Sequence, residues 1–390
     1  MKMLHNVDLY TFLSSYWQKK PLLIRNALAP DLFTLTPEEL AGLACEEGIE
    51  SRLITGTQQR GFQLQHGPFD EATFTSLPTK AWTVLVQAVD HVDPEVAALL
   101  DYFRFIPNWR IDDIMISYAA PEGSAGPHYD NYDVFLIQGR GTRQWQIGAM
   151  LDERTPLAAH SELRLLEQFE AVEQWELEPG DILYLPPRVA HWGISTSDNC
   201  MTYSVGFRSP SIAELLSECC DQAIAQLSDE QRYEDPGLAL QENPGEISST
   251  AFDSIQRQLL AQLSNRDQLE RWIGCYVTQP KYSLEDEHSL EPLFSLSEQL
   301  ADELCDADRV IRDPATRFAF SQHDQQLKLF VDGRCYELAP SHRPFVELVC
   351  ANAVLDTSQL AAYLSDNHIA ALMLELFNGG SLYFEDELLD

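Results

Sequence analysis

The feature that most constrains the fold is a series of short β-type runs in the first half of the chain, separated by Gly- and Pro-containing turns. The runs occupy residues 114–120, 133–139, 143–148, 181–187 and 200–207. Many short strands with this punctuation predict a β-barrel or β-sandwich. The stretch before them is more helical, and Thr36 followed by Pro37 is typical of a helix start.

The chain becomes helical after residue 208. Phe252, Ile255, Leu259 and Leu263 recur at three- and four-residue spacing and form one apolar stripe. Such a stripe more commonly packs within its own chain, and a dimer interface is the alternative. An acidic segment with Pro and Gly, at about 229–246, is predicted to be a loop between two helical blocks.

The last third of the chain mixes strands and helices. The predicted elements are a hairpin over 325–340 that turns at Asp332-Gly333, helices over 344–354 and 358–376, and a strand over 381–384. This order is compatible with a small winged-helix-like module. Acidic side chains outnumber basic ones in this region, whereas a module that reads DNA needs a basic face. We therefore expect no direct DNA binding.

The formal net charge of the 390 residues is −35. A surface this acidic repels phosphate backbones and attracts basic partners. The alternative is that the acidity serves solubility alone or reflects a salt-adapted host. No apolar run approaches the roughly 20 residues of a membrane helix, and the N-terminus lacks the pattern of a signal peptide. We expect a soluble, cytoplasmic protein that does not associate with membranes.

Two histidines and one aspartate carry the strongest chemical signal. His128 and Asp130 lie two residues apart, and His191 follows a Pro-Pro bend between two β-type runs. Residues i and i+2 of a strand share a face, so both side chains can enter one barrel. Two histidines and one carboxylate form the facial triad that holds Fe(II) and leaves positions for a bidentate 2-oxo acid and dioxygen. A lone H-x-D pair is common by chance, but the combination predicts a metal site.

Arg143 is predicted to face the same interior. Strand alternation places it on the side of Trp145 and Ile147, where an unpaired cation is costly. The carboxylate of a cosubstrate could pair with this guanidinium. An internal salt bridge and an exposed position at the hairpin end are the alternatives. Ser117 could add a hydroxyl to the same carboxylate, or it could be an ordinary polar strand residue.

Several motifs resemble those of the bacterial ribosomal oxygenases. They are YWQKKPLLIR at 16–25, GPFD at 67–70, RIDDIMISY at 110–118, PHYDNYDVFLIQG at 127–139, EPGDILYLPP at 178–187 and YSVGFR at 203–208. The resemblance is close over the first 208 residues, and the order of the remaining domains agrees. It implies an α+β chain with three parts. They are a JmjC-type double-stranded β-helix (cupin) domain over 1–208, a helical dimerisation region over 209–278 and a winged-helix-like domain over 279–390.

The resemblance also implies the chemistry. It implies that His128, Asp130 and His191 bind Fe(II) as the catalytic centre, and that Arg143 anchors the cosubstrate 2-oxoglutarate. It further implies a homodimer that hydroxylates an arginine side chain in the sixteenth protein of the large ribosomal subunit. The anchor is often lysine in the wider JmjC group. Arg140 lies close by, so the choice between the two arginines depends on strand parity.

A basic ribosomal protein would suit the acidity of the chain. Asp112, Asp113 and Asp133 are candidates to pair with an entering arginine, although a turn or surface role is the simpler interpretation of each. Two other functions stay open. One is a JmjC-type protein demethylase with the same metal site, and the other is a metal-binding cupin that serves as an interaction module without oxygenase activity.

Overall fold

The protein is described by a computed structural model, which covers residues 4–158, 162–282, 293–294 and 297–385. The chain divides into two compact units, Met1–Ser209 and Pro210–Asp390. The first unit contains all five of the predicted β-type runs as strands.

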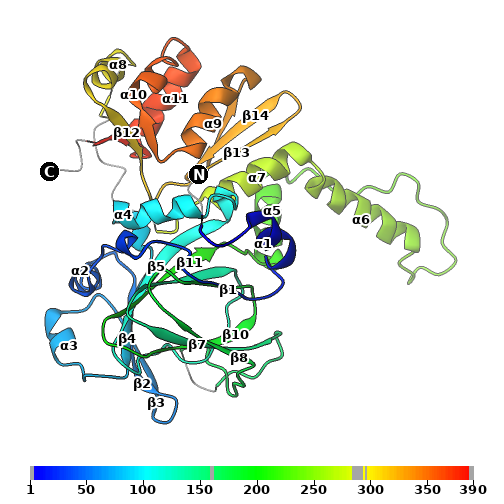
Figure 1. Ribbon diagram of the computed structural model, residues 1–390. Coiled ribbons are helices and arrows are strands. Elements are labelled where there is room, and N and C mark those ends of the chain that lie inside the picture. Colours follow the sequence, from blue (N-terminus) through cyan, green and yellow to red (C-terminus); the bar gives the residue numbers. More distant parts are fainter. Residues whose placement is uncertain (1–3, 159–161, 283–292, 295–296, 386–390) are drawn as a thin grey trace. The chain divides into compact units, whose positions relative to one another are not determined.

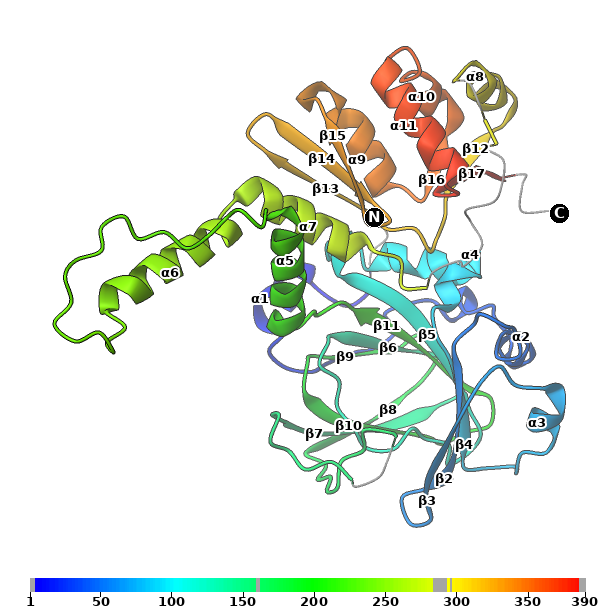
Figure 2. The same ribbon diagram turned by 180° about the vertical axis from the view of Figure 1, so that it is seen from behind.

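Two antiparallel sheets face each other in the first unit (Figure 1, Figure 2). The larger sheet has the order β1-β9-β6-β11-β5-β4-β2-β3, and the smaller has the order β10-β7-β8. The strands of the larger sheet are β1 (Leu22–Ile24), β2 (Ser51–Thr57), β3 (Gly61–His66), β4 (Trp82–Val86), β5 (Ile111–Ala119), β6 (Val134–Arg140), β9 (Ile182–Leu185) and β11 (Cys200–Phe207). Those of the smaller sheet are β7 (Arg143–Met150), β8 (Glu173–Leu177) and β10 (Val189–Ser195).

Short helices pack on the outer face of the larger sheet. They include α1 (Leu9–Ser15), α2 (Pro37–Leu43), α3 (Glu71–Thr75) and α4 (Pro94–Ala97). Ile114 and Ile116 of β5 join Phe12 of α1 in the larger hydrophobic core. The start of α2 is as predicted, because the Thr36 side chain accepts a hydrogen bond from the backbone N–H of Glu39 and the Glu39 carboxylate caps Thr36 in return.

The space between the two sheets holds a smaller core and the polar groups of the candidate site. Leu136 of β6 and Trp145 of β7 pack there. Alternate residues of a strand point to opposite faces. Asp113 and Ser117 of β5 are both buried and lie on the face opposite to the outward-packing isoleucines. They therefore point toward the smaller sheet.

The second unit begins with three helices, α5 (Ile212–Gln226), α6 (Ser249–Leu263) and α7 (Arg266–Thr278). The predicted acidic loop separates α5 from α6. Trp272 of α7 is buried against Cys219 and Ala223 of α5. Most of the apolar stripe of α6 is not buried, since Phe252 is 58% exposed and Leu259 is 64% exposed. Its last residue, Leu263, packs against the cluster around Trp272. The expectation that the stripe packs within its own chain is therefore wrong for Phe252 and Leu259 and correct for Leu263.

The remainder of the second unit combines two small sheets with helices. Its elements are α8 (Ser297–Asp306), β12 (Arg309–Arg312), β13 (Phe318–His323), β14 (Gln326–Val331), β15 (Arg334–Leu338), α9 (Arg343–Ala351), β16 (Val354–Asp356), α10 (Thr357–Ala361), α11 (Asn367–Asn378) and β17 (Leu382–Phe384). The hairpin at Asp332-Gly333 is confirmed, because Val331 of β14 pairs with Arg334 of β15.

Two predicted helices of this region have different limits. The first ends at Ala351 because Val354 pairs with β12 as part of a strand. The second is divided into α10 and α11 because the Asp366 side chain caps the start of a new helix. Among the described helices, none is long and apolar enough to cross a membrane.

Candidate metal centre

His128 and Asp130 lie in the segment between β5 and β6, outside any regular strand. A single β-bridge joins His128 to His191 of β10. The backbone N–H of His128 donates to the carbonyl of His191 at 3.0 Å, and the reverse bond is 2.8 Å long. The two-residue spacing thus brings the side chains together as predicted, but on an extended segment that forms an isolated bridge with β10 rather than on a strand of a ladder.

The three side chains converge. Their potential ligand atoms lie within 4.8 Å of one another. Oδ2 of Asp130 is 3.9 Å from Nε2 of His128 and 3.6 Å from Nε2 of His191. Bonds from a metal ion to nitrogen or oxygen are about 2 Å long, so donors this close can share one ion. The donor set of two imidazoles and one carboxylate is that of non-haem Fe(II) sites.

The backbone orients both imidazoles. Nδ1 of His128 lies 2.9 Å from the carbonyl oxygen of Gly126, and Nδ1 of His191 lies 3.0 Å from that of Val189. A carbonyl can only accept, so each Nδ1 carries the proton and each Nε2 keeps the lone pair that a metal needs. Burial, followed by the neighbouring His128, lowers the pKa of His191 to about 4. His191 is therefore neutral at physiological pH, as a ligand must be.

Arg143 begins β7 and faces the interior, as strand parity predicts. Its side chain is 4% exposed, and Nε and Nη2 are buried without a hydrogen-bond partner among the described residues. Arg140 points elsewhere, because its Nη2 donates to the backbone carbonyls of Phe33 and Thr34 at 3.3 and 2.9 Å. Buried polar groups are nearly always paired. Two buried nitrogens of Arg143 are unpaired within the described residues, against Nε alone in Arg140, so Arg143 is the better candidate to bind an anionic ligand.

Comparisons with known proteins agree with this geometry. A JmjC domain model matches residues 98–215, and a ROXA-like winged helix model matches residues 258–383. The ribosomal protein uL16 3-hydroxylase of Escherichia coli is 34% identical over 374 residues, which cover 96% of this chain and 97% of that protein. The chain belongs to the JmjC-type ribosomal oxygenase family. The predicted fold class, a cupin followed by a winged-helix-like domain, is thereby confirmed.

Other family members are similarly close. A probable ribosomal oxygenase of Haemophilus influenzae is 33% identical over 335 residues, covering 82% of this chain and 77% of that protein. The structure of the Escherichia coli ribosomal oxygenase YcfD in complex with cobalt and 2-oxoglutarate matches with a TM-score of 0.84 and 32% identity. The match covers 98% of this chain and 99% of that one.

Of the three aspartates considered for substrate binding, Asp113 lies on the interior face of β5. Asp113 is buried, and its Oδ2 accepts a hydrogen bond from Nε2 of Gln87 at 2.8 Å. Asp112 lies 3.3 Å from Nε of Arg208 and pairs with it. The charge of Asp130 raises the pKa of Tyr132, and that of Asp113 adds to the rise. Tyr132 is thus close to both carboxylates.

The suggestion that Asp133 pairs with an entering arginine is wrong. Asp133 is fully buried and accepts hydrogen bonds from the Tyr184 hydroxyl at 2.6 Å and from Nε2 of Gln18 at 2.9 Å. Nη2 of Arg110 lies 3.4 Å away. Burial raises the pKa of Asp133 despite these partners. The carboxylate ties the N-terminal segment to the larger sheet and has a structural role.

Ser117 lies on the face of β5 that points into the barrel. It is buried on β5 and pairs across the sheet with Thr202 of β11. Its contact with a cosubstrate stays a prediction. Ser124 is also buried, and its hydroxyl forms three hydrogen bonds close to the triad. The sequence gives no sign of this role. A serine in a Gly- and Pro-rich segment has the pattern of an ordinary turn residue.

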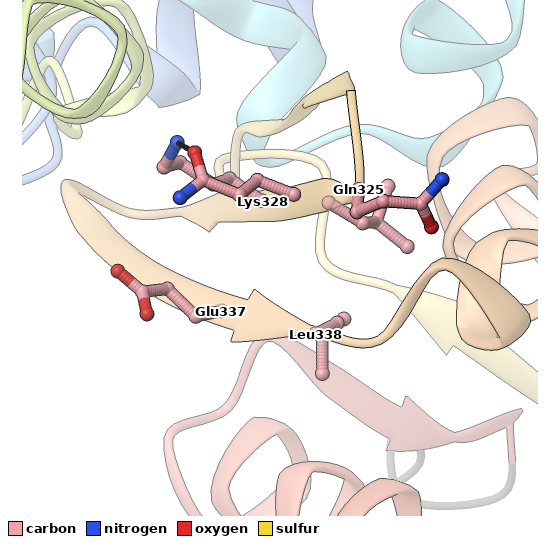
Figure 3. A pocket seen from close by; sticks show the side chains of 6 residues that line it. Gln325, Lys328, Glu337 and Leu338 are labelled. Carbon is pink, nitrogen blue, oxygen red and sulfur yellow. Dashed lines mark hydrogen bonds between the residues drawn. The ribbon is translucent and has the colours of Figure 1, made fainter. Parts of the chain in front are cut away.

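A separate pocket lies on the β14–β15 hairpin of the second unit, lined by Gln325, Gln326, Leu327, Lys328, Glu337 and Leu338 (Figure 3). Its two charged side chains already have partners. Lys328 Nζ lies 2.5 Å from Asp267 Oδ1 and 3.7 Å from Glu270 Oε2, and Glu337 pairs with Arg271. Because both charged side chains are already paired, this pocket is a weaker candidate for ligand binding than the site formed by the triad and Arg143.

Proposed function

We propose that this chain is an Fe(II)- and 2-oxoglutarate-dependent oxygenase that hydroxylates an arginine side chain of the ribosomal protein uL16. The observation that carries the proposal is the buried, unpaired guanidinium of Arg143 in the same barrel as the His128, Asp130 and His191 cluster. A metal site alone would suit many cupins. The buried cation of Arg143 beside that site favours a cosubstrate that carries a carboxylate.

The proposed roles follow from the geometry. His128, Asp130 and His191 would hold the iron on one side and leave the other side for ligands. Arg143 would receive the distal carboxylate of 2-oxoglutarate through paired, charge-assisted hydrogen bonds. This anchoring fixes the orientation of the cosubstrate and lowers the entropic cost of reaction. Iron and 2-oxoglutarate, when bound, supply the oxidising chemistry, and the protein supplies ligands, placement and exclusion of water.

An arginine side chain is the substrate that best suits the other carboxylate of the interior. Asp113 is buried on the interior face of β5 and can accept hydrogen bonds from a guanidinium. Tyr132 stands beside Asp130 and is 43% exposed, so its ring is available to stack on a planar cation. The net charge of −35 would draw a basic ribosomal protein toward the enzyme. We place the activity in the cytoplasm, where ribosomal proteins are made.

We also propose that the chain acts as a homodimer, as the predicted dimerisation region at 209–278 implies. Phe252, Ile255 and Leu259 form an exposed apolar stripe on α6. An apolar face of this kind on a helix is a common protein-binding surface. The extent of the predicted domains, 1–208, 209–278 and 279–390, remains part of this proposal.

The test is mass spectrometry of purified uL16 incubated with the enzyme, Fe(II), 2-oxoglutarate and oxygen, next to a His128→Ala control. We expect one added oxygen on an arginine of uL16, and none in the control. Formaldehyde release from a methylated peptide would indicate a demethylase instead. Metal binding without succinate formation would indicate an inactive cupin.

A further inference from the structure

The segment that carries His128 and Asp130 runs beside β10, which carries His191. The backbone N–H of Glu122 donates to the carbonyl of Ser195 at 3.0 Å, and the N–H of Ser195 donates to the carbonyl of Gly123 at the same distance. The two segments meet again at the bridge between the histidines. Between these two backbone contacts, the Ser124 side chain connects the segments.

The Ser124 hydroxyl uses its whole hydrogen-bonding capacity. It donates to the carbonyl of Gly193 at 2.7 Å, and it accepts from the backbone N–H of Gly126 at 3.0 Å and from Nε1 of Trp192 at 2.8 Å. A hydroxyl has one donor and two acceptor positions, so all three are occupied. Ser124 is 4% exposed, which makes each of these bonds costly to lose.

Two of these bonds lead directly to the histidines. The N–H of Gly126 is fixed by Ser124, and the carbonyl of the same residue accepts the Nδ1 proton of His128 at 2.9 Å. Trp192 is the chain neighbour of His191, and the carbonyl of Gly193 lies one residue further on. One hydroxyl thus links Gly126, the residue whose carbonyl orients His128, to the strand that presents His191.

The backbone of Gly126 adopts a conformation that favours glycine. Gly126 has a φ of +82°, and a Cβ built on it would lie 2.6 Å from Leu165 and 3.0 Å from Phe62. The side chains of Leu165 and Phe62 therefore pack close to the α-carbon of Gly126. The bond from Ser124 holds the N–H of this residue, and these constraints together restrict the carbonyl that faces His128.

We propose that Ser124 is a positioning residue of the metal centre. Its hydroxyl holds the N–H of Gly126 and, through the restricted backbone of that residue, the carbonyl that sets the tautomer and ring orientation of His128, so that Nε2 points toward Asp130 and His191. The inference rests on the proposed metal site but concerns a residue outside the ligand set. Groups that orient a metal-ligating histidine typically change metal affinity 10- to 100-fold when they are removed.

The experiment measures Co(II) binding to the metal-free full chain by visible absorption, without any turnover. Ser124→Ala is compared with Ser124→Thr, which keeps a hydroxyl, and with Thr83→Val as the matched control. Thr83 is also buried, and its hydroxyl donates to the carbonyl of Tyr118 at 2.7 Å within the larger sheet. Nitrogen-15 NMR of the histidine rings reports the protonation of Nδ1 and Nε2 in the same proteins.

We expect Ser124→Ala to bind Co(II) about tenfold more weakly or worse, and the NMR signals of His128 to show mixed tautomers. Ser124→Thr should bind more tightly than the alanine variant, and Thr83→Val should bind like the wild type even if its melting temperature falls. Wild-type affinity and a single tautomer in Ser124→Ala would overturn the inference. So would an equal loss in Thr83→Val, because general destabilisation would then explain the effect.

Trp192→Phe provides a second route if Ser124→Ala does not fold, because it removes one of the three bonds and keeps the hydroxyl. We expect weaker Co(II) binding and broadened His128 signals, and wild-type behaviour would overturn the inference in this form too. Failure of the wild-type chain to bind Co(II) would instead refute the proposed metal site, so the two failures are distinguishable.

Discussion

Replacing Arg143 by methionine should have two opposite effects, on stability and on cosubstrate binding. The guanidinium is 4% exposed, and its Nε and Nη2 are buried without a partner among the described residues. A buried donor without a partner costs about 1–3 kcal/mol. Methionine is shorter than arginine, unbranched and uncharged, so the variant avoids this cost. Without ligand, Arg143→Met should therefore be more stable than the wild type.

The size of both effects can be worked from the two unpaired nitrogens. At about 1 kcal/mol for each, the gain in stability is about 2 kcal/mol, or roughly 4–8 °C in melting temperature for a domain of this size. Two hydrogen bonds to a carboxylate, at about 1.5 kcal/mol each, contribute about 3 kcal/mol to 2-oxoglutarate binding. Their loss should raise the Kd about 150-fold.

The assay is thermal unfolding with and without 2-oxoglutarate, together with calorimetric titration of the cosubstrate in the presence of Co(II). Arg140→Met is the matched control, because Arg140 lies three residues away and donates to Phe33 and Thr34. It should lose stability and keep 2-oxoglutarate affinity within about twofold. A destabilised Arg143→Met with unchanged cosubstrate affinity would refute the reasoning, since Arg143 would then be a paired structural residue.

Three further predictions concern the substrate, the dimer and pH. Asp113→Ala should raise the KM for a uL16 peptide about tenfold or more, because a charge-assisted hydrogen bond is lost, and should leave the Kd for 2-oxoglutarate unchanged. Steady-state hydroxylation measures the KM, and titration measures the Kd. A shift in both constants would contradict this prediction. Leu259→Asp on the exposed face of α6 should convert a dimer to a monomer in light scattering after size exclusion, and an unchanged mass would exclude this face. Burial raises the pKa of Asp133 above 3.8 despite the nearby Arg110 and Tyr184, so the folded state binds this proton more tightly than the unfolded state. Wild-type stability should therefore fall as pH rises from 3.8 through the raised pKa. Asp133→Asn lacks this pH dependence of stability. In urea unfolding across that pH range, the stability of the variant should therefore rise relative to that of the wild type. Parallel curves of stability against pH for the two proteins would contradict the assignment.

The candidate ligands and the cosubstrate anchor could be predicted from the sequence because their signals are local. Alternation along β7 places Arg143 with Trp145 on the buried face, as the structure shows. The two-residue spacing of His128 and Asp130 also brings both side chains together, although their extended segment forms an isolated bridge and not a strand of a ladder. The hairpin at Asp332-Gly333 could also be predicted from the sequence, because its turn depends on the conformational preferences of two adjacent residues.

Only the tertiary structure separated residues whose local patterns are alike. Asp113 and Asp133 are both acidic residues near a motif, yet one faces the barrel interior and the other binds Tyr184 and Gln18 from distant parts of the chain. The apolar stripe of α6 marks a helix in either case, and only the fold shows that Phe252, Ile255 and Leu259 stay exposed.

Ser124 illustrates the physical reason for this limit. Its three hydrogen bonds join residues 124 and 126 to residues 192 and 193, which are almost 70 positions further along the chain. Backbone periodicity determines which face a side chain takes, and a sequence shows that periodicity directly. Which groups meet across that face depends on how strands from separate parts of the chain are paired, and the register of the folded sheets alone determines it.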